Sequence, residues 1–544
     1  MKAELIRIYK VLHTWTGILA GMALFIAFFA GALTMFEEPL TRWASAPGAA
    51  DIVSLDETQA LIVDTLRERP DAAKDFTVHL QPTEATPARL TWHVRPEGAG
   101  EHDESGGQHF LATRDANGAL EIREHHPASV GPLIDTLHRV VGLPFDNDPG
   151  RLFMGIVAVL YALALFSGVV IIFPSLVRDL FALRIGKNLK RMWMDAHNAV
   201  GVLSLPFHIV IACTAVVFAF HDFIYAGQDA LVHDGELATA FRPPPPPPGT
   251  PIERDPAEMQ SPADLIALVE AESPSFEVSS LQYVGVSGPR AAVRVWGTDP
   301  AAISPRGPGG FAIVDPYGGR IVNEAFMPGR QSAPNLVVSS FFALHMGAFG
   351  GGLIRWAYFL LGLAGAWLFY TGNLLWVESR RKKAPRGRDG QPDQPRNVRL
   401  MASATVGVCL GSVCGIALTL LASKWLPGRV DDLASAHLLL YYGGFFGALV
   451  WAFARGGARA AVHLLWIAAL LTAALPLSTL LGWLAPASGT WAHTSGAALA
   501  VDGTALALAV GFALMARATA RRARHGSRDS VWALPAAPVP EPAE

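Results

Sequence analysis

Four histidines in the first 380 residues have the type and spacing to bind a metal group. They belong to an internal repeat: His13 and His197 each stand four residues before a glycine, and His138 and His345 each follow a leucine. A neutral imidazole is a common iron ligand, and two imidazoles from different helices ligate one b-type haem. The four residues therefore predict two haem sites. Covalent attachment is excluded because the sequence has no Cys-x-x-Cys-His motif.

A fifth histidine, His208, leaves the ligand pairing open. It follows His197 by eleven residues, which is roughly 16 Å along an α-helix. That position suits either of two roles. In the first, His208 is a ligand of the second haem in place of His138 or His345. In the second, it forms a hydrogen bond to a neighbouring helix beside Pro206.

The elements that must hold these histidines are membrane-spanning helices. Of the 544 residues, 51% are hydrophobic and 16% are charged, whereas soluble domains average about 25% charged residues. A bilayer core needs roughly 20 apolar residues in a helix. Eight segments meet that requirement: about 14–36, 152–174, 198–220, 356–377, 401–423, 433–454, 460–485 and 494–516. We expect an all-α membrane protein whose first four spans form a haem-binding four-helix core.

Lysine and arginine collect on one side of the expected membrane. They lie before the first span, between spans two and three, between spans four and five, and in the tail. The positive-inside rule makes that side cytoplasmic, so both termini are expected there, and the long segments at about 45–137 and 221–340 are expected in the periplasm. His13 and His197 then lie at the cytoplasmic ends of their spans, and His138 and His345 at the periplasmic ends. The chain is expected in a bacterial inner membrane.

Each periplasmic segment has the pattern of a small α+β insert. The first has an amphipathic helix at 56–69, strands at 76–80 and 89–94, and a hairpin turning at 115–118. The second has a helix at 261–272, strands at 276–284 and 291–296, and a turn at 315–319, after a stiff spacer of six prolines at 243–248. The first insert also has six histidines that we expect on its solvated surface: His79, His93, His102, His109, His125 and His126.

The expected domain boundaries follow the spans and inserts. They are a first transmembrane helix (1–44), the first insert (45–137), helices two and three with a basic loop (138–220), the second insert (221–344), helix four (345–380), a basic cytoplasmic linker (381–400), a C-terminal four-helix membrane block (401–516) and a cytoplasmic tail (517–544).

The C-terminal block contains three polar side chains whose role the sequence leaves open. His437 and His493 either ligate a third haem, line a quinol site or are ordinary interfacial residues. Asp502 is either a proton relay or a buried polar contact. The many small residues of the block favour close helix packing without a catalytic role.

Several segments of the first 380 residues resemble the PepSY-associated transmembrane family. They are 9–17 (YKVLHTWTG), 137–139 (LHR), 205–208 (LPFH) and 344–347 (LHMG). The family includes inner-membrane reductases of ferric siderophores. The resemblance implies a four-helix core with two haems that reduces iron(III)-siderophore complexes at the periplasmic face. Its haem ligands would be His13, His197, His138 and His345. The block at 401–516 is a departure, since a minimal member of the family lacks it.

The sequence excludes some functions and keeps two alternatives. It has neither a Rossmann glycine motif after a strand nor a Walker A motif, so a separate electron donor, from the cytoplasm or the quinol pool, is expected. Nucleic-acid binding is excluded because no soluble segment has a basic stripe with aromatic residues. The alternatives are a membrane protein that binds peptides or peptidases through its inserts, and a permease for a metal or siderophore.

Overall fold

The computed structural model describes residues 3–47, 53–94, 107–126, 128–144, 148–177, 189–232, 234–236, 246, 248–306, 309–383 and 392–534. The chain forms two compact units. We call Met1–Leu40, Ser129–Ala212 and Phe359–Glu544 the helical unit, and Thr41–Ala128 with Cys213–Tyr358 the sheet unit. Most of the expected proline spacer, Pro243–Pro245 and Pro247, lies outside the described residues.

Seven helices in the described part of the chain are long and apolar enough to cross a membrane. They are α1 (Ala3–Thr34), α5 (Asp148–Ile172), α13 (Gly351–Arg380), α14 (Arg396–Ala422), α15 (Leu433–Arg455), α16 (Gly457–Leu484) and α17 (Gly496–His525). Each corresponds to a span that the apolar pattern predicts. The prediction of a mainly helical, multi-pass membrane protein is therefore confirmed.

The third predicted span is not one straight helix. It consists of α7 (Leu189–Leu203) and α8 (Leu205–Ala219), which are bent by 71° at the break between them. Pro206 stands in the first turn after that break, where its ring and missing N–H prevent regular helical continuation. The single span expected at 198–220 is wrong in this respect. Counted as one broken span, the pair brings the total to the expected eight.

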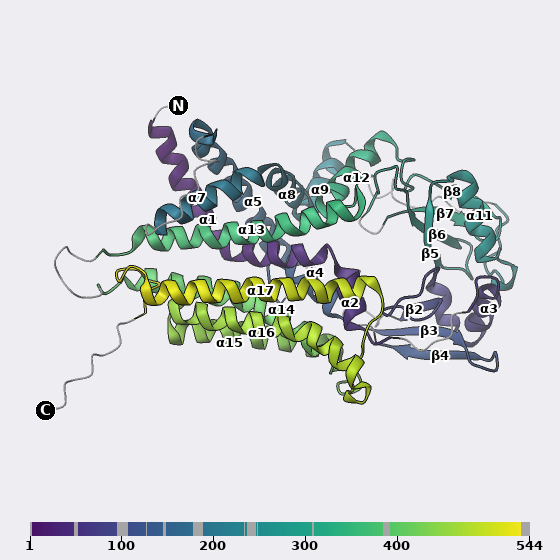
Figure 1. Ribbon diagram of the computed structural model, residues 1–544. Coiled ribbons are helices and arrows are strands. Elements are labelled where there is room, and N and C mark those ends of the chain that lie inside the picture. The colour runs from purple at the N-terminus through teal and green to yellow at the C-terminus, as the bar shows by residue number, and fades with distance from the viewer. Residues whose placement is uncertain are drawn as a thin grey trace. The chain divides into compact units, whose positions relative to one another are not determined.

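The C-terminal helices pack closely through small residues. Figure 1 shows α14, α15, α16 and α17 side by side. A Cβ atom added at Gly415 of α14 would lie 2.9 Å from the Tyr441 ring of α15, and one at Gly411 would lie 3.1 Å from the Phe445 carbonyl oxygen. Glycine thus lets the two helices approach, as the composition of this block predicts.

The two predicted inserts form one sheet rather than two separate units. Its eight strands have the order β4-β3-β2-β1-β5-β6-β7-β8, all antiparallel. They are β1 (Asp75–His79), β2 (Leu90–Val94), β3 (Gln108–Arg114), β4 (Leu120–His125), β5 (Glu277–Val284), β6 (Ala292–Thr298), β7 (Gly310–Asp315) and β8 (Arg320–Asn323). The first strand of one insert pairs with the first strand of the other, Phe76 opposite Tyr283. Separate inserts would have left both of these edges unpaired.

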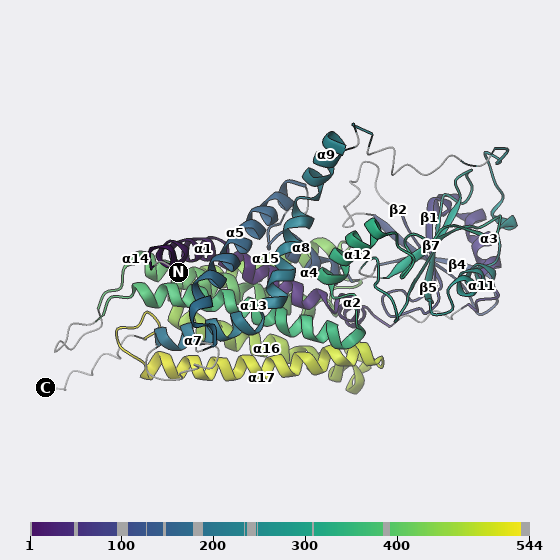
Figure 2. The ribbon, with the colours of Figure 1, turned by 90° about the horizontal axis from the view of Figure 1, so that it is seen from above.

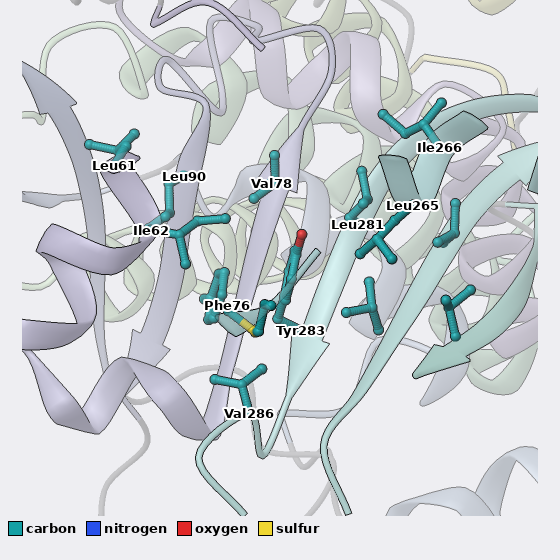
Figure 3. Packing of buried hydrophobic residues seen from close by; sticks show 14 of the residues in the cluster. Leu61, Ile62, Phe76, Val78, Leu90, Leu265, Ile266, Leu281, Tyr283 and Val286 are labelled. Carbon is teal, nitrogen blue, oxygen red and sulfur yellow. The ribbon is translucent and has the colours of Figure 1, made fainter. Parts of the chain in front are cut away.

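The core of the sheet unit lies under two helices, α3 (Thr58–Glu68) and α11 (Pro262–Glu272), which cover the same side of the sheet (Figure 1 and Figure 2). At its centre the rings of Phe76 and Tyr283 stack with their centroids 4.5 Å apart (Figure 3). The Ser261 hydroxyl accepts a hydrogen bond from the Asp264 amide and caps α11. Both helices lie where their amphipathic patterns predict them.

Shorter elements complete the described chain. They are α2 (Glu37–Ala44), α4 (Val130–Arg139), α9 (His221–Val232), α12 (Ala333–Met346), and the 3-10 turns η1 (Pro70–Lys74), η2 (Phe173–Ser175), η3 (Pro256–Glu258) and η4 (Pro486–Ser488). The Asp115 carboxylate accepts hydrogen bonds from the amides of Asn117 and Ala119, which fixes the predicted hairpin turn between β3 and β4. Of these elements, α4 and α12 carry His138 and His345.

Candidate functional site

The structure brings His13 of α1 and His197 of α7 together. Their ring centroids are 6.3 Å apart, and the ring planes are inclined by 75°. A metal–imidazole bond is about 2 Å long and the ring centre lies about 1 Å behind the nitrogen, so imidazoles on opposite sides of one metal have centres about 6 Å apart. The spacing would let both imidazoles hold one iron.

The two rings are oriented by equivalent hydrogen bonds. Nδ1 of His13 lies 2.8 Å from the Ala164 carbonyl oxygen of α5, and Nδ1 of His197 lies 3.2 Å from the Leu368 carbonyl oxygen of α13. These carbonyls occupy corresponding places, since Ala164 precedes Gly168 by four residues and Leu368 precedes Gly372 by four. A carbonyl acceptor requires a proton on Nδ1, which leaves the Nε2 lone pair available for a metal.

A glycine adjoins each ring. A Cβ atom at Gly168 would lie 3.1 Å from Cε1 of His13, and one at Gly372 would lie 3.5 Å from Cε1 of His197. Both histidines are partly exposed rather than packed. The ring-centroid distance of 6.3 Å and the glycine beside each ring fit a haem held by both histidines.

The second predicted pair is anchored in a similar way, each member within its own unit. In the helical unit, Nδ1 of His138 lies 2.8 Å from the Ala27 carbonyl oxygen of α1. In the sheet unit, Nδ1 of His345 lies 2.8 Å from the Thr214 hydroxyl of α8. Ala27 follows His13 by 14 residues and Thr214 follows His197 by 17, so the second anchor lies three residues further along its half of the repeat. Both rings are partly exposed.

A glycine also adjoins the ring of His138. Gly31 lies beside it as Gly168 and Gly372 lie beside the rings of His13 and His197. A Cβ atom at Gly31 would lie 2.7 Å from Nδ1 of His138, a distance that side-chain carbons do not tolerate. The imidazole therefore rests directly on the backbone of α1, and its orientation is set by α1 as well as by its own helix.

His208 has a different environment from these four residues. It is 1% exposed, and its Nδ1 lies 2.6 Å from the Tyr161 hydroxyl. The rings of Phe28 and Phe369 pack against it. Its Nε2 has no hydrogen-bond partner among the described residues. The residue at the corresponding place in α1, eleven after His13, is Leu24, so His208 lies outside the repeat. The predicted hydrogen bond to a neighbouring helix is present.

The three polar residues noted in the C-terminal block are all buried. His437 is 1% exposed, His493 is 0% and Asp502 is 8%. Nδ1 of His437 lies 2.7 Å from the Ser129 hydroxyl, and the Thr479 hydroxyl lies 3.2 Å from an Asp502 carboxylate oxygen. Among the described residues no three His, Cys, Asp or Glu side chains are arranged to hold a metal ion.

Sequence reasoning missed Lys424, which is fully buried beside this group. Its Nζ donates a hydrogen bond of 2.8 Å to the Thr479 hydroxyl. Lys424 directly follows an apolar segment, where a lysine normally extends toward water. The same Thr479 hydroxyl donates a hydrogen bond of 3.2 Å to an Asp502 carboxylate oxygen, so Thr479 links the two charged residues. The available signal in the sequence was a lysine and an aspartate that both lie in or beside apolar segments, since charges inside membrane proteins tend to pair.

Three histidines of the first insert lie in a row across the sheet. His109 is opposite both His93 and His125, and the rings of His93 and His109 stack 4.2 Å apart. Burial and the neighbouring histidines lower the pKa of His109 to about 4. Burial also lowers the pKa of His79 to about 4. His126 is exposed, as expected for a solvated side chain. The other four described histidines of the insert are partly buried, namely His79, His93, His109 and His125, and His102 lies outside the described residues.

These features define a multi-pass membrane protein in which an internal repeat supplies paired histidines and two inserts combine into one sheet. The chain belongs to the family described as the PepSY-associated TM region, which matches residues 11–379. That range contains all five candidate ligand histidines and ends before the C-terminal block. A search of curated proteins gave no match.

Proposed function

We propose that the protein is a di-haem b-type oxidoreductase of the bacterial inner membrane that reduces periplasmic iron(III)-siderophore complexes and releases iron(II). The observation that carries the proposal is the His13–His197 pair, with ring centroids 6.3 Å apart and an equivalent backbone hydrogen bond on each ring. The chain belongs to the PepSY-associated TM family, and the finer proposal of ferric-siderophore reduction follows the resemblance noted in its sequence segments.

The residues proposed to hold the haems are His13 with His197, and His138 with His345. We prefer His345 to His208 for the second pair because His138 and His345 are related by the repeat and are both partly exposed, whereas His208 is buried against Tyr161. When bound, haem supplies one-electron transfer. The chain's own contribution is to orient each imidazole through Nδ1. Backbone carbonyls accept the Nδ1 proton of His13, His138 and His197 and set their tautomer. The Thr214 hydroxyl holds Nδ1 of His345.

The proposed substrate follows from the chemistry of iron. Siderophores bind iron(III) through hard oxygen donors, and the same donors hold iron(II) far less tightly. Reduction by one electron therefore releases the metal. The positive-inside rule puts both inserts in the periplasm and both termini in the cytoplasm, so the sheet unit is the proposed part of the chain that meets the ferric complex.

The electron donor is proposed to be a separate molecule, either a cytoplasmic reductant or a membrane quinol. The sequence lacks the glycine motifs that bind a dinucleotide or a nucleoside triphosphate. A quinol would give up two protons as well as electrons, and the buried Asp502 and His493 are the residues of the C-terminal block to test for that role.

The first experiment is a visible spectrum of the detergent-purified protein, oxidised and then reduced with dithionite, with haem counted as the pyridine haemochrome. We expect a sharp reduced α-band and about two haems per chain. The reduced protein is then mixed anaerobically with a ferric siderophore, and we expect reoxidation of the α-band with iron(II) trapped by a chromogenic chelator.

The control is the same protein mixed with a gallium(III) siderophore, which has the same shape but is not reduced. Reoxidation by the gallium complex would point to contaminating oxygen. A colourless protein would overturn the proposal and favour the peptide-binding or permease alternatives.

A further inference from the structure

The short helix that carries His138 is held at both ends by the C-terminal block. At its start, the Ser129 hydroxyl lies 2.7 Å from Nδ1 of His437 of α15. Just after its end, the Gly142 carbonyl oxygen accepts a hydrogen bond of 3.2 Å from the Tyr442 hydroxyl, also of α15. Ser129 is the N-cap residue of α4 but its side chain makes no capping bond. Its hydroxyl contacts His437 instead.

The end of α4 has a backbone conformation that its neighbours must maintain. Val141 has a φ angle of 51° and Gly142 one of 78°, and a left-handed conformation is unfavourable for a β-branched residue such as valine. A Cβ atom at Gly142 would lie 2.9 Å from Ile26 of α1. The turn is therefore pressed against α1, with Tyr442 bonded to its carbonyl. Strain of this kind persists where the surroundings fix the chain, often at functional sites.

The second half of the repeat secures its histidine helix through a residue of the following span. There α12 ends at Gly347, which has a φ angle of 61°. The Tyr358 hydroxyl of the following helix, α13, donates a hydrogen bond of 2.6 Å to the Leu344 carbonyl oxygen. A Cβ atom at Gly347 would lie 3.2 Å from the Tyr358 ring. One tyrosine from the next span thus holds the turn beside His345.

The first half lacks that tyrosine. Tyr358 precedes Gly372 by 14 residues, and the residue 14 before Gly168 is Met154. A methionine thioether has no hydrogen to donate, so α5 cannot make the bond that α13 makes. The hydroxyl at the end of α4 comes instead from Tyr442, which lies beyond the part of the chain that matches the family.

We propose that Tyr442 and His437 are positioning residues for His138, and that the C-terminal block supplies to the first half of the repeat the support that Tyr358 supplies to the second. The inference rests on the proposed haem-binding function. The ring of His138 already lies against α1 at Ala27 and Gly31, so a small rotation or shift of α4 moves its Nε2 away from a ligand position. Outer contacts that orient a metal-binding histidine typically change metal affinity about 10–100-fold.

The test compares two neighbouring tyrosines of α15. Tyr442→Phe removes the hydroxyl that bonds to Gly142. Tyr441→Phe is the matched control, because the Tyr441 hydroxyl is buried and has no hydrogen-bond partner among the described residues. We expect Y442F to weaken one of the two haem sites about tenfold and to shift its midpoint potential. We expect Y441F to match the wild type, and His437→Phe to act in the same direction as Y442F.

A second measurement keeps the test independent of haem. Hydrogen exchange of the α4 amides in haem-free full-length protein should be faster in Y442F than in Y441F, with α12 unchanged in both. Equal haem content, potential and exchange in the two variants would overturn the inference and leave the proposed function standing. If the wild-type protein binds no haem, the proposed function is overturned. In that case the exchange measurement still tests the contact: unchanged α4 exchange in Y442F would show that Tyr442 does not hold α4 in place.

Discussion

The two halves of the repeat agree at the residues that could bind a metal and differ in how those residues are supported. His13 and His197 are anchored to equivalent carbonyls, with a glycine beside each ring. The helices that carry them are not alike, since α1 is continuous and α7 is separated from α8 by a bend of 71°. The two halves therefore share the surroundings of the histidine and differ in the course of the helix that carries it.

The difference between the helices has a simple local cause. Pro206 occupies the position that Met22 occupies in α1, as each lies nine residues after its histidine. Methionine continues a helix, whereas proline interrupts its hydrogen bonds. The bend begins beyond His197, so the histidine keeps its place on α7 while the rest of the span changes direction. The two halves of the repeat can therefore diverge beyond this histidine while its position is kept.

The largest expected effect comes from removing either member of the first pair. We expect His13→Ala and His197→Ala each to lower the haem count from about two to about one per chain, because one imidazole does not hold a six-coordinate haem. Pyridine haemochrome measurements on both variants check this. Unequal losses would mean that the two halves do not share one site.

A nearly equal loss of haem should show whether His345 or His208 holds the second haem. We expect His345→Ala to lose the second haem and His208→Leu to keep both, because leucine is the residue at the matching place in α1. His138→Ala should resemble His345→Ala. The spectra of the three purified variants give the answer, and loss of a haem in His208→Leu alone would reverse the assignment.

A smaller effect should distinguish the two glycines. Alanine at Gly168 brings a Cβ to 3.1 Å from the His13 ring, while alanine at Gly372 stays 3.5 Å from the His197 ring. We expect haem affinity to fall about tenfold for Gly168→Ala and less for Gly372→Ala. Both substitutions raise helix propensity by about 1 kcal/mol, so that contribution cancels in the comparison. Haem titration of apoprotein measures both affinities.

The smallest effect concerns acid stability of the sheet. Strands β1 to β4 each contain one partly buried histidine, and β5 to β8 contain no histidine. In the folded state the pKa of His79 and of His109 is lowered to about 4, below the value of about 6.5 in unfolded chains. The unfolded state then binds more protons below pH 6.5, so stability decreases as pH falls toward 4.

Hydrogen exchange, corrected for its intrinsic pH dependence, should reveal this asymmetry. Between pH 7 and pH 5 we expect β1 to β4 to open up to about tenfold more often, a value that allows for solvent screening of partly exposed rings. The strands β5 to β8 serve as the internal control, and His79→Gln should reduce the effect. An equal change in both halves of the sheet would contradict the prediction.

Much of the fold follows from local sequence patterns. The apolar segments place the spans, the amphipathic patterns place α3 and α11, and the Asp115 turn places a hairpin. The repeat of four histidines also stands in the sequence, including the glycines that later adjoin the rings. The spans, the two helices and the turn each depend on residues close together in the sequence, so periodicity and spacing reveal them. The histidine repeat is visible because the same residue pattern recurs along the chain.

Contacts between distant parts of the chain required the tertiary structure. The pairing of β1 with β5 joins residues about 200 positions apart and turns two expected inserts into one sheet. Neither the contact of Lys424 with Thr479 nor that of Tyr442 with Gly142 has a local signature. Strand edges pair and buried polar groups find partners wherever the folded chain brings them together. The sequence by itself determined the candidate histidines and their helices, and tertiary packing decided which side chains hold them in place.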